Sequence, residues 1–331
     1  MPTPLAVALG DPAGIGPEIV AKAWERRAEA GLSPFFAVGS DASVAAVWNG
    51  PIRIIDEPGQ AAACFGEALP LIRVDGDAPV VPGEPSVEGA HTALHALELA
   101  VGLTRSGVAS ALVTGPVSKA QLYSIGFIHP GQTEFVAERC GIAADMVAMM
   151  LAGPSLRTVP VTTHVALRDV PDLLSVELIV AKGRATIRGL RRQFGIARPR
   201  IAVAGLNPHA GEQGALGREE IDIVIPAIER LREEDAEITG PHAPDAMFHA
   251  SARALYDAAL CLYHDQALVP LKTLHFDEGV NMTLGLPIVR TSPDHGTAFA
   301  IAGRGEAHPG AMIAALRTAA EAAARIAAAA A

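Results

Sequence analysis

The 331-residue sequence is poor in lysine, cysteine and aromatic residues, and each shortage argues against a class of protein. Only four lysines occur, the net charge is −10 and no basic run is present, so nucleic acid and anionic membranes are not expected partners. The three cysteines form no CxxC pair and no disulfide framework, which suits a reducing cytoplasm. No apolar run approaches the ~20 residues that span a bilayer, and residues 1–14 lack a basic signal-peptide start. We therefore expect a cytoplasmic protein.

Several common catalytic motifs are also missing from the sequence. The glycine pairs at residues 14–16 and 303–305 do not complete G-x-G-x-x-G, the usual dinucleotide-binding signature. No lysine follows a glycine, so there is no Walker A loop, and neither G-x-S-x-G nor H-E-x-x-H occurs. Rossmann, P-loop, α/β-hydrolase and zincin enzymes therefore lack their signatures here.

What the sequence does contain is a regular alternation of apolar and amphipathic segments. Half of the residues are hydrophobic and 19% are charged, which is enough to bury a large core. Short apolar runs at residues 4–10, 35–39 and 200–204 alternate with helical patterns such as 16–31 and 175–195. This alternation predicts an α/β fold with a mainly parallel sheet. No flexible linker separates two halves, so two domains would be interleaved along the chain.

Three histidines follow predicted strands. His164 comes after "TVPVTT", His209 after "IAVAGLNP" and His264 after "LCLY". Ligands of open α/β sheets gather at the carboxyl ends of strands, so the three imidazoles are expected to converge on one divalent ion. Three neutral nitrogens leave a fourth position open, as in catalytic sites, and suit zinc, cobalt or nickel better than magnesium. Asp245 and Asp265 could add an oxygen ligand or orient a ring.

The spacing of the histidines also allows interpretations other than a metal site. Each of these histidines taken alone could equally be a hydrogen-bonded residue at the start of a loop. His91, His95 and Glu98 lie near one face of a predicted helix, but a solvent-exposed helix surface explains them better than a metal site.

Possible anion contacts are spread along the chain. "PGQTEFVAER" predicts a loop entering a helix at Thr133, where backbone N–H groups could face an anion or simply be capped. Lys272 and Arg290 are flanked by apolar residues, so each either snorkels or faces an anionic ligand. Asn281 lies beside a predicted strand, as a turn residue or a ligand contact.

Six motifs, in order, together resemble the 4-hydroxythreonine-4-phosphate dehydrogenase family of pyridoxal phosphate biosynthesis, over residues 10 to about 303. They are GDPAGIGPE (10–18), VTGPVSK (113–119), GQTEF (131–135), LNPHAGE (206–212), YHDQALVPLK (263–272) and GVNMTLGLPIVRTSPDHGTAF (279–299). The resemblance implies two interleaved α/β/α domains with a cleft, like those of isocitrate and isopropylmalate dehydrogenases, a fold without the Rossmann fingerprint. We expect one domain from residues 1–126 plus 295–331, and a second from 127–294 that carries most of the metal and substrate site.

The resemblance also implies a site and a reaction. The metal ligands would be His164, His209 and His264, one of them from the partner in a homodimer whose active site lies at the interface. The positions that match the family's substrate contacts are Gln132, Thr133, Lys272, Asn281 and Arg290. The implied cofactors are NAD or NADP and one divalent metal, zinc, cobalt or magnesium.

The implied reaction is oxidation of 4-phosphohydroxy-L-threonine to 2-amino-3-oxo-4-phosphooxybutanoate, which decarboxylates to 3-amino-2-oxopropyl phosphate. The candidates for the general base are Asp245 and a metal-bound water. Gln132 stands where the family usually has histidine in G-H-T-E-F, and Ala300 where it has a larger or acidic residue. Because of these departures, two alternative functions remain: a related dehydrogenase that acts on 4-phosphorylated threonate or erythronate, or one that acts on an aromatic cis-dihydrodiol. A three-histidine metallohydrolase and a catalytically idle metabolite-binding protein are alternatives of different classes.

Overall fold

The computed structural model describes residues 3–74 and 80–330, and its chain divides into two compact units. Unit 1 comprises Met1–Cys140 and Pro287–Ala324, and unit 2 comprises Gly141–Leu286 and Arg325–Ala331. The sequence division placed the boundaries at 126/127 and 294/295. Residues 127–140 and 287–294 therefore fall in unit 1 instead of the expected second domain, and the strand within 287–294 pairs with the sheet of unit 1.

The strands of unit 1 are parallel, and β1, β2, β5 and β12 are buried along their whole length, whereas β3 is largely exposed. Their order in the sheet is β3-β4-β2-β1-β5-β12, and the paired strands run parallel. Such strands read as continuous apolar runs, as the "LAVA" of β1 does. The strand bounds are β1 Leu5–Ala8, β2 Phe35–Gly39, β3 Ile52–Ile54, β4 Leu69–Arg73, β5 Leu112–Thr114 and β12 Arg290–Pro293.

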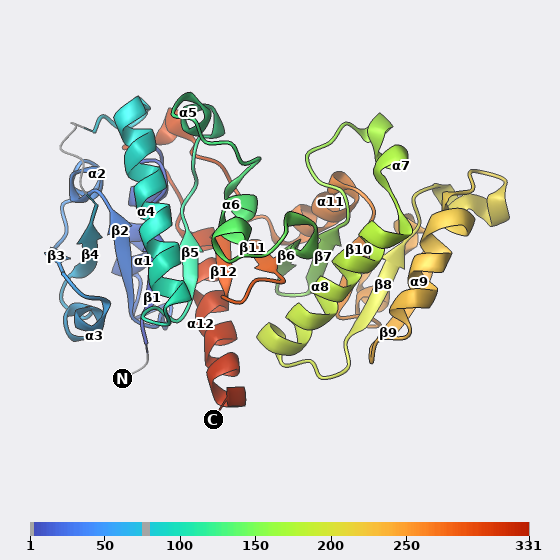
Figure 1. Ribbon diagram of the computed structural model, residues 1–331. Helices are drawn as coiled ribbons and strands as arrows, with labels where there is room; N and C mark the ends of the chain where they lie inside the picture. Colours follow the sequence, from blue (N-terminus) through green and yellow to red (C-terminus); the bar gives the residue numbers. More distant parts are fainter. Residues whose placement is uncertain (1–2, 75–79, 331) are drawn as a thin grey trace. The chain divides into compact units, whose positions relative to one another are not determined.

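Helices connect and cover these strands. The longest connecting helix, α4 (Val87–Arg105), starts at the N-cap Ser86, whose hydroxyl accepts from Gly89 N, and packs on β1 and β2 (Figure 1). The other helices of this part of the chain are α1 Gly16–Glu25, α2 Asp41–Ala45, α3 Ala61–Cys64, α5 Lys119–Ser124, α6 Gln132–Arg139 and α12 Gly310–Ala330, whose last residues are assigned to unit 2.

The sheet of unit 2 is mixed. Its order is β11-β6-β7-β10-β8-β9, in which β6 runs antiparallel to β7 and β11, while β7, β10, β8 and β9 are mutually parallel. The strand bounds are β6 Ala148–Gly153, β7 Leu156–Pro160, β8 Arg200–Ala204, β9 Glu237–His242, β10 Ala258–Cys261 and β11 Val280–Leu284. The carboxyl ends of β7, β10 and β8 therefore lie side by side at one edge.

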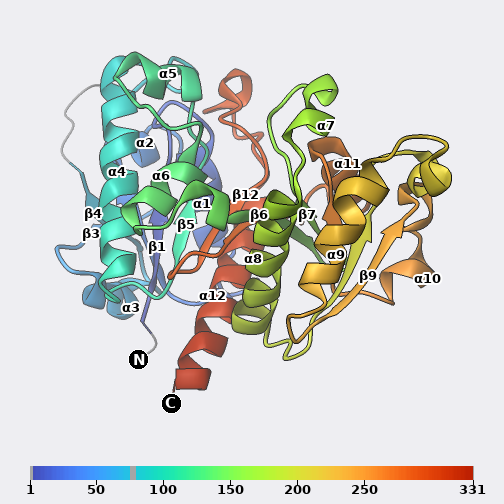
Figure 2. The same cartoon turned by 45° about the vertical axis from the view of Figure 1, so that its right-hand side comes forward.

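Two long helices dominate this unit, α8 (Val176–Phe194) and α11 (His264–His275). Figure 2 shows α8 beside α9 (Ile225–Leu231), and Gly183 permits that contact, since a Cβ there would lie 2.5 Å from Leu231. Helix α11 packs on β6, β7 and β10. The two short helices are α7 Val170–Leu173 and α10 Ala250–Arg253.

The predicted mainly parallel α/β fold is confirmed, with the apolar runs at 4–10, 35–39 and 200–204 forming β1, β2 and β8. Within the described ranges, no helix is both long enough and apolar enough to cross a bilayer.

Candidate active site

The three candidate metal ligands follow three neighbouring strands of unit 2. His164 lies four residues after the end of β7, His264 begins α11 three residues after β10, and His209 lies five residues after β8. Because β7, β10 and β8 are parallel neighbours, the three histidines leave the sheet at the same edge.

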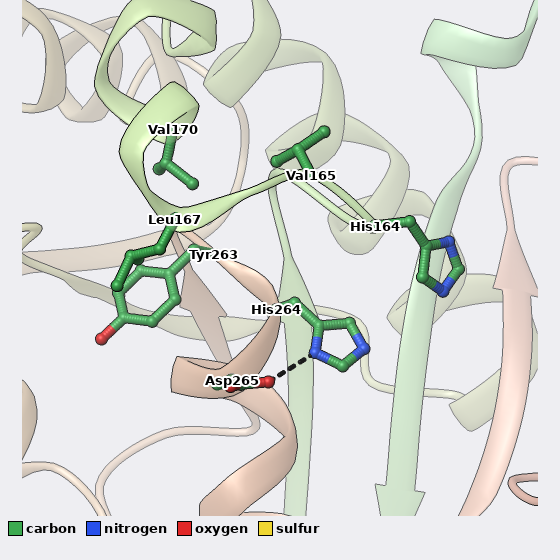
Figure 3. Close-up of a pocket in the computed structure, with 7 residues that line it drawn as sticks. All are labelled: His164, Val165, Leu167, Val170, Tyr263, His264 and Asp265. Carbon is green, nitrogen blue, oxygen red and sulfur yellow. Dashed lines mark hydrogen bonds and ion pairs between the residues drawn. The ribbon is translucent and has the colours of Figure 1, made fainter.

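Two of these imidazoles lie together. The ring centroids of His164 and His264 are 5.7 Å apart, and both rings line a hollow of about 210 Å³ (Figure 3). Asp265 Oδ1 lies 2.7 Å from His264 Nδ1, although the Asp265 side chain itself is 76% exposed. With the proton held at Nδ1 by this carboxylate, the Nε2 lone pair of His264 is available to a ligand. Of the two roles considered for Asp265, its position fits orienting the ring.

The third candidate, His209, is exposed. Among residues 3–74 and 80–330, no three His, Cys, Asp or Glu side chains are grouped closely enough to hold a metal ion. Asp245 is exposed on the short 3₁₀ turn Pro244–Ala246. A single chain therefore brings together two of the three predicted metal ligands.

The backbone at both loop histidines is left-handed. His164 has φ 52°, and His209 begins five consecutive residues, through Gln213, with φ between 43° and 80°. For L-residues this conformation costs about 1–2 kcal/mol each, so it persists only where surrounding contacts hold it. Left-handed residues other than glycine cluster at ligand sites, which favours a functional role for these two loops.

The donor set fits a divalent transition metal in part. Two neutral imidazoles at the mouth of a hollow, one of them oriented by a carboxylate, are the ligands that zinc or cobalt prefers. Two such ligands make an incomplete site, because catalytic zinc usually has three protein ligands.

A buried cation marks a separate group in unit 1. Arg290, the first residue of β12, is 4% exposed; its Nη2 donates to Thr114 Oγ1 at 2.8 Å and its Nη1 to Thr133 Oγ1 at 3.4 Å. Burial lowers the pKa of the Arg290 guanidinium to about 10, and nearby Glu134 opposes this shift. The Arg290 guanidinium therefore remains charged at neutral pH, and its neighbours are the hydroxyls of Thr114 and Thr133.

Gln132 joins the same group. It is the first residue of α6, and its Nε2 donates to Gly115 O at 3.1 Å. Its Oε1 is buried and, within the part of the chain that the structure describes, has no hydrogen-bond partner. The hydrogen bond to the Gly115 carbonyl fixes the Gln132 amide with its nitrogen toward that carbonyl. The Gln132 oxygen is therefore available to accept a hydrogen bond from a ligand.

The remaining predicted contacts belong to unit 2. Lys272 lies on α11 and lines a second hollow, of about 430 Å³, that shares His264 and Asp265 with the first. Asn281 lies in β11 opposite Leu151, and among the described residues its buried Oδ1 lacks a hydrogen-bond partner. The five predicted substrate contacts thus form two sets, one in each unit.

Sequence reasoning missed some polar residues at these sites. Thr114 bonds the Arg290 guanidinium from the end of β5, and Gln266, two residues after His264, is buried at 7% exposure. The sequence offered one signal for each residue. Thr114 is the polar residue that ends the apolar run "ALVT", and Gln266 is the amide within "YHDQALV". His91 and His95 are exposed on α4, and Glu98 pairs with Arg139, so the expected helix surface is confirmed.

Comparisons with known proteins agree with this architecture. A family model described as "Pyridoxal phosphate biosynthetic protein PdxA" matches residues 33–319. The 4-hydroxythreonine-4-phosphate dehydrogenase of Zymomonas mobilis is 58% identical over 320 residues, covering 97% of this chain and 96% of that protein. A crystal structure of 4-hydroxythreonine-4-phosphate dehydrogenase from Klebsiella pneumoniae matches at 37% identity with a TM-score of 0.87, covering 97% of this chain and 100% of that chain.

More distant structures match the same fold. A terephthalate 1,2-cis-dihydrodiol dehydrogenase from Burkholderia xenovorans matches at 28% identity with a TM-score of 0.66, over 96% of this chain and 98% of that one. An isocitrate dehydrogenase from Methylococcus capsulatus, at 16% identity and a TM-score of 0.50 over 99% and 88% of the two chains, shows the fold alone. The predicted isocitrate-dehydrogenase-like fold is therefore confirmed.

The fold and these matches define an oxidoreductase of the two-unit α/β dehydrogenase class. The chain belongs to the PdxA family, the 4-hydroxythreonine-4-phosphate dehydrogenases of pyridoxal phosphate biosynthesis. It is accordingly an enzyme, as the motifs predicted, and dehydrogenation implies a nicotinamide cofactor.

Proposed function

We propose that this chain catalyses the metal-dependent, NAD- or NADP-linked oxidation of 4-phosphohydroxy-L-threonine in the cytoplasm. The product would be 2-amino-3-oxo-4-phosphooxybutanoate, a β-keto acid that loses CO₂ to give 3-amino-2-oxopropyl phosphate. The observation that carries the proposal is the His164–His264 pair at the strand ends, with its Asp265 partner, in a chain of this family. The metallohydrolase alternative is not favoured, because the family consists of dehydrogenases.

The metal site is proposed at His164, His209 and His264. A bound zinc, cobalt or magnesium ion would supply Lewis acidity that lowers the pKa of the substrate hydroxyl, and the nicotinamide would accept the hydride. The chain's own contribution would be orientation: Asp265 would keep a proton on His264 Nδ1 and leave the Nε2 lone pair available to the ion.

The phosphate site is proposed at Arg290 and Thr133 in unit 1, and Lys272 of unit 2 is proposed as a further substrate contact. A planar guanidinium can bind two phosphate oxygens at once, and the Thr133 hydroxyl near it can donate a further hydrogen bond. Gln132 would contact the same substrate through its buried Oε1, which accepts a hydrogen bond from a hydroxyl or ammonium group. Asn281 offers a second buried acceptor for such a group.

The active form is proposed to be a homodimer in which one copy supplies His209 to the other copy's His164 and His264. The single chain supports this proposal. The ring centroids of His164 and His264 lie 5.7 Å apart, and no third potential ligand is grouped with them among the described residues.

The decisive experiment is a turnover assay on protein stripped of metal by a chelator. Reduced nicotinamide should accumulate only when 4-phosphohydroxythreonine, NAD or NADP, and a divalent metal are all present. Undiminished activity in metal-free buffer would refute the metal role, and release of inorganic phosphate without nicotinamide reduction would support a hydrolase.

Substrate choice is tested in the same assay by comparing 4-phosphohydroxythreonine with 4-phosphothreonate and 4-phosphoerythronate. Because Gln132 replaces the family's histidine, the Gln132→His variant is the matched comparison. We expect the amino-acid substrate to be preferred by both proteins; preference for a sugar acid by the parent protein would favour the related dehydrogenase.

A further inference from the structure

Buried hydrogen bonds link the chain segments that carry the three histidines in unit 2. The first link joins the segments that directly follow β7 and β10. Thr162, 5% exposed, donates from its hydroxyl to Leu262 O at 2.8 Å. Thr162 and Leu262 each lie two residues before a candidate ligand, His164 and His264. This bond therefore holds the starts of the two loops together.

The second link joins β10 to β8 through the amide of Gln266. Its Oε1 accepts from Leu262 N at 2.6 Å, and its Nε2 donates to Gly205 O at 2.8 Å. One partner is a donor and the other an acceptor, so the amide has one orientation that satisfies both. Gln266 thus fixes the end of the strand before His264 relative to the end of the strand before His209.

The third link holds the left-handed turn of His209. Glu220, 2% exposed, accepts through Oε1 from Leu206 N and Asn207 N at 2.7 Å each, and through Oε2 from Asn207 Nδ2 at 3.0 Å. A Cβ on Gly211 would lie 2.5 Å from Glu220 Oε2, so the carboxylate lies against the turn itself.

Glu220 is anchored from its own side. It begins a π-helical segment, Glu220–Val224, that continues directly into α9, where Ala227, Ile228 and Leu231 are buried. Single π-helical turns occur often at functional sites. Here the side chain of Glu220, the first residue of this turn, supports the loop of a candidate metal ligand.

We propose that Gln266 and Glu220 are positioning residues that set the geometry of the three histidines for the metal. The inference rests on the proposed metal site, and neither residue is proposed to touch metal or substrate. Groups that hold metal ligands in place typically change metal affinity about 10–100-fold when they are removed. Glu219, which also accepts from Asn207 Nδ2 at 2.7 Å, limits how far the turn can relax.

The test compares Glu220→Gln and Gln266→Glu with a matched control, Glu229→Gln, an exposed carboxylate on α9. Glutamine at 220 removes the charge and sets an amide against the Asn207 amide, whereas glutamate at 266 keeps the acceptor and removes the donor to Gly205 O. Three quantities are measured on metal-free protein: the thermal unfolding midpoint, the affinity for Zn²⁺ by calorimetry, and the visible spectrum after adding Co²⁺.

We expect both positioning variants to fold, to bind Zn²⁺ about 10–100-fold more weakly and to show an altered Co²⁺ spectrum, while Glu229→Gln matches the parent. The proposal would be overturned if both variants kept the parental Zn²⁺ affinity and Co²⁺ spectrum while His209→Ala lost Zn²⁺ affinity. If His209→Ala itself keeps parental affinity, the three-histidine site of the proposed function fails instead. Should Glu220→Gln not fold, Gln266→Glu decides by the same comparison.

Discussion

Arg290 shows at the scale of one residue how a charge can be kept inside this fold. Its guanidinium is 4% exposed and bonds the hydroxyls of Thr114 and Thr133. Such a group retains its charge at neutral pH, since burial lowers its pKa only to about 10. A phosphate bound there would meet a cation already freed from most of its water, which strengthens the attraction.

Replacing Arg290 by lysine should therefore impair recognition of the phosphate. Lysine keeps the charge but loses the planar fork, and one charge-assisted hydrogen bond contributes about 1.5–3 kcal/mol. We expect KM for the phosphorylated substrate to rise roughly 10–100-fold with a smaller change in kcat, measured by steady-state kinetics. Arg168→Lys, at a side chain that is 88% exposed, is the control. An unchanged KM in Arg290→Lys would place the phosphate elsewhere.

At the scale of elements, a partly buried ion pair in α1, Lys22 with Glu18, joins this helix to the segment before α12 through hydrogen bonds to its backbone. Lys22 Nζ donates to Glu18 Oε1 at 2.7 Å and to the carbonyls of Gly305 and Ala307 at 2.8 Å each. Glu18, 1% exposed, also accepts from the backbone N of Gly303 and Ala307. Two elements nearly 300 residues apart are thereby joined within unit 1.

Lys22→Met should destabilise the protein by roughly 2–3 kcal/mol, because it removes three charge-assisted bonds and leaves the Glu18 carboxylate buried without its cation. Urea unfolding measures the effect. The comparison is Arg230→Met, which breaks the exposed Arg230–Glu177 pair at 3.0 Å and should cost under about 1 kcal/mol. Equal losses in the two variants would mean that burial adds nothing to the Lys22 contact.

Element identity and strand ends were predictable from sequence, whereas loop conformation was not. Apolar runs such as "RIAVA" predict buried strands, and a histidine after such a run predicts a residue at the carboxyl edge. The left-handed turn at His209 leaves no periodic signal, because it depends on Glu220, eleven positions away in the chain. The positions of residues 127–140 and 287–294 likewise follow from tertiary packing, such as β12 pairing with β5, which periodicity does not encode.

At the scale of the whole molecule, the proposed sharing of histidines between copies predicts a complementation pattern. Mixing inactive His209→Ala and His264→Ala proteins after partial unfolding should restore activity, since each mixed dimer contains one complete set of ligands. Random pairing would return roughly a quarter of parental turnover.

The control is a mixture of His164→Ala and His264→Ala. Their rings lie 5.7 Å apart in one chain, so both sites of the mixed dimer stay incomplete and no activity should return. Recovery in this second mixture, or none in the first, would contradict the proposed division of ligands.

The turn at His209 has a consequence for the order of folding. Its five left-handed residues are disfavoured in an isolated segment, and the carboxylate that holds them arrives only when the helix beginning at Glu220 has docked against its sheet. This loop should consequently be among the last parts of the nascent chain to mature. Newly made protein would then pass through a compact stage that has its core but cannot yet take up its ion.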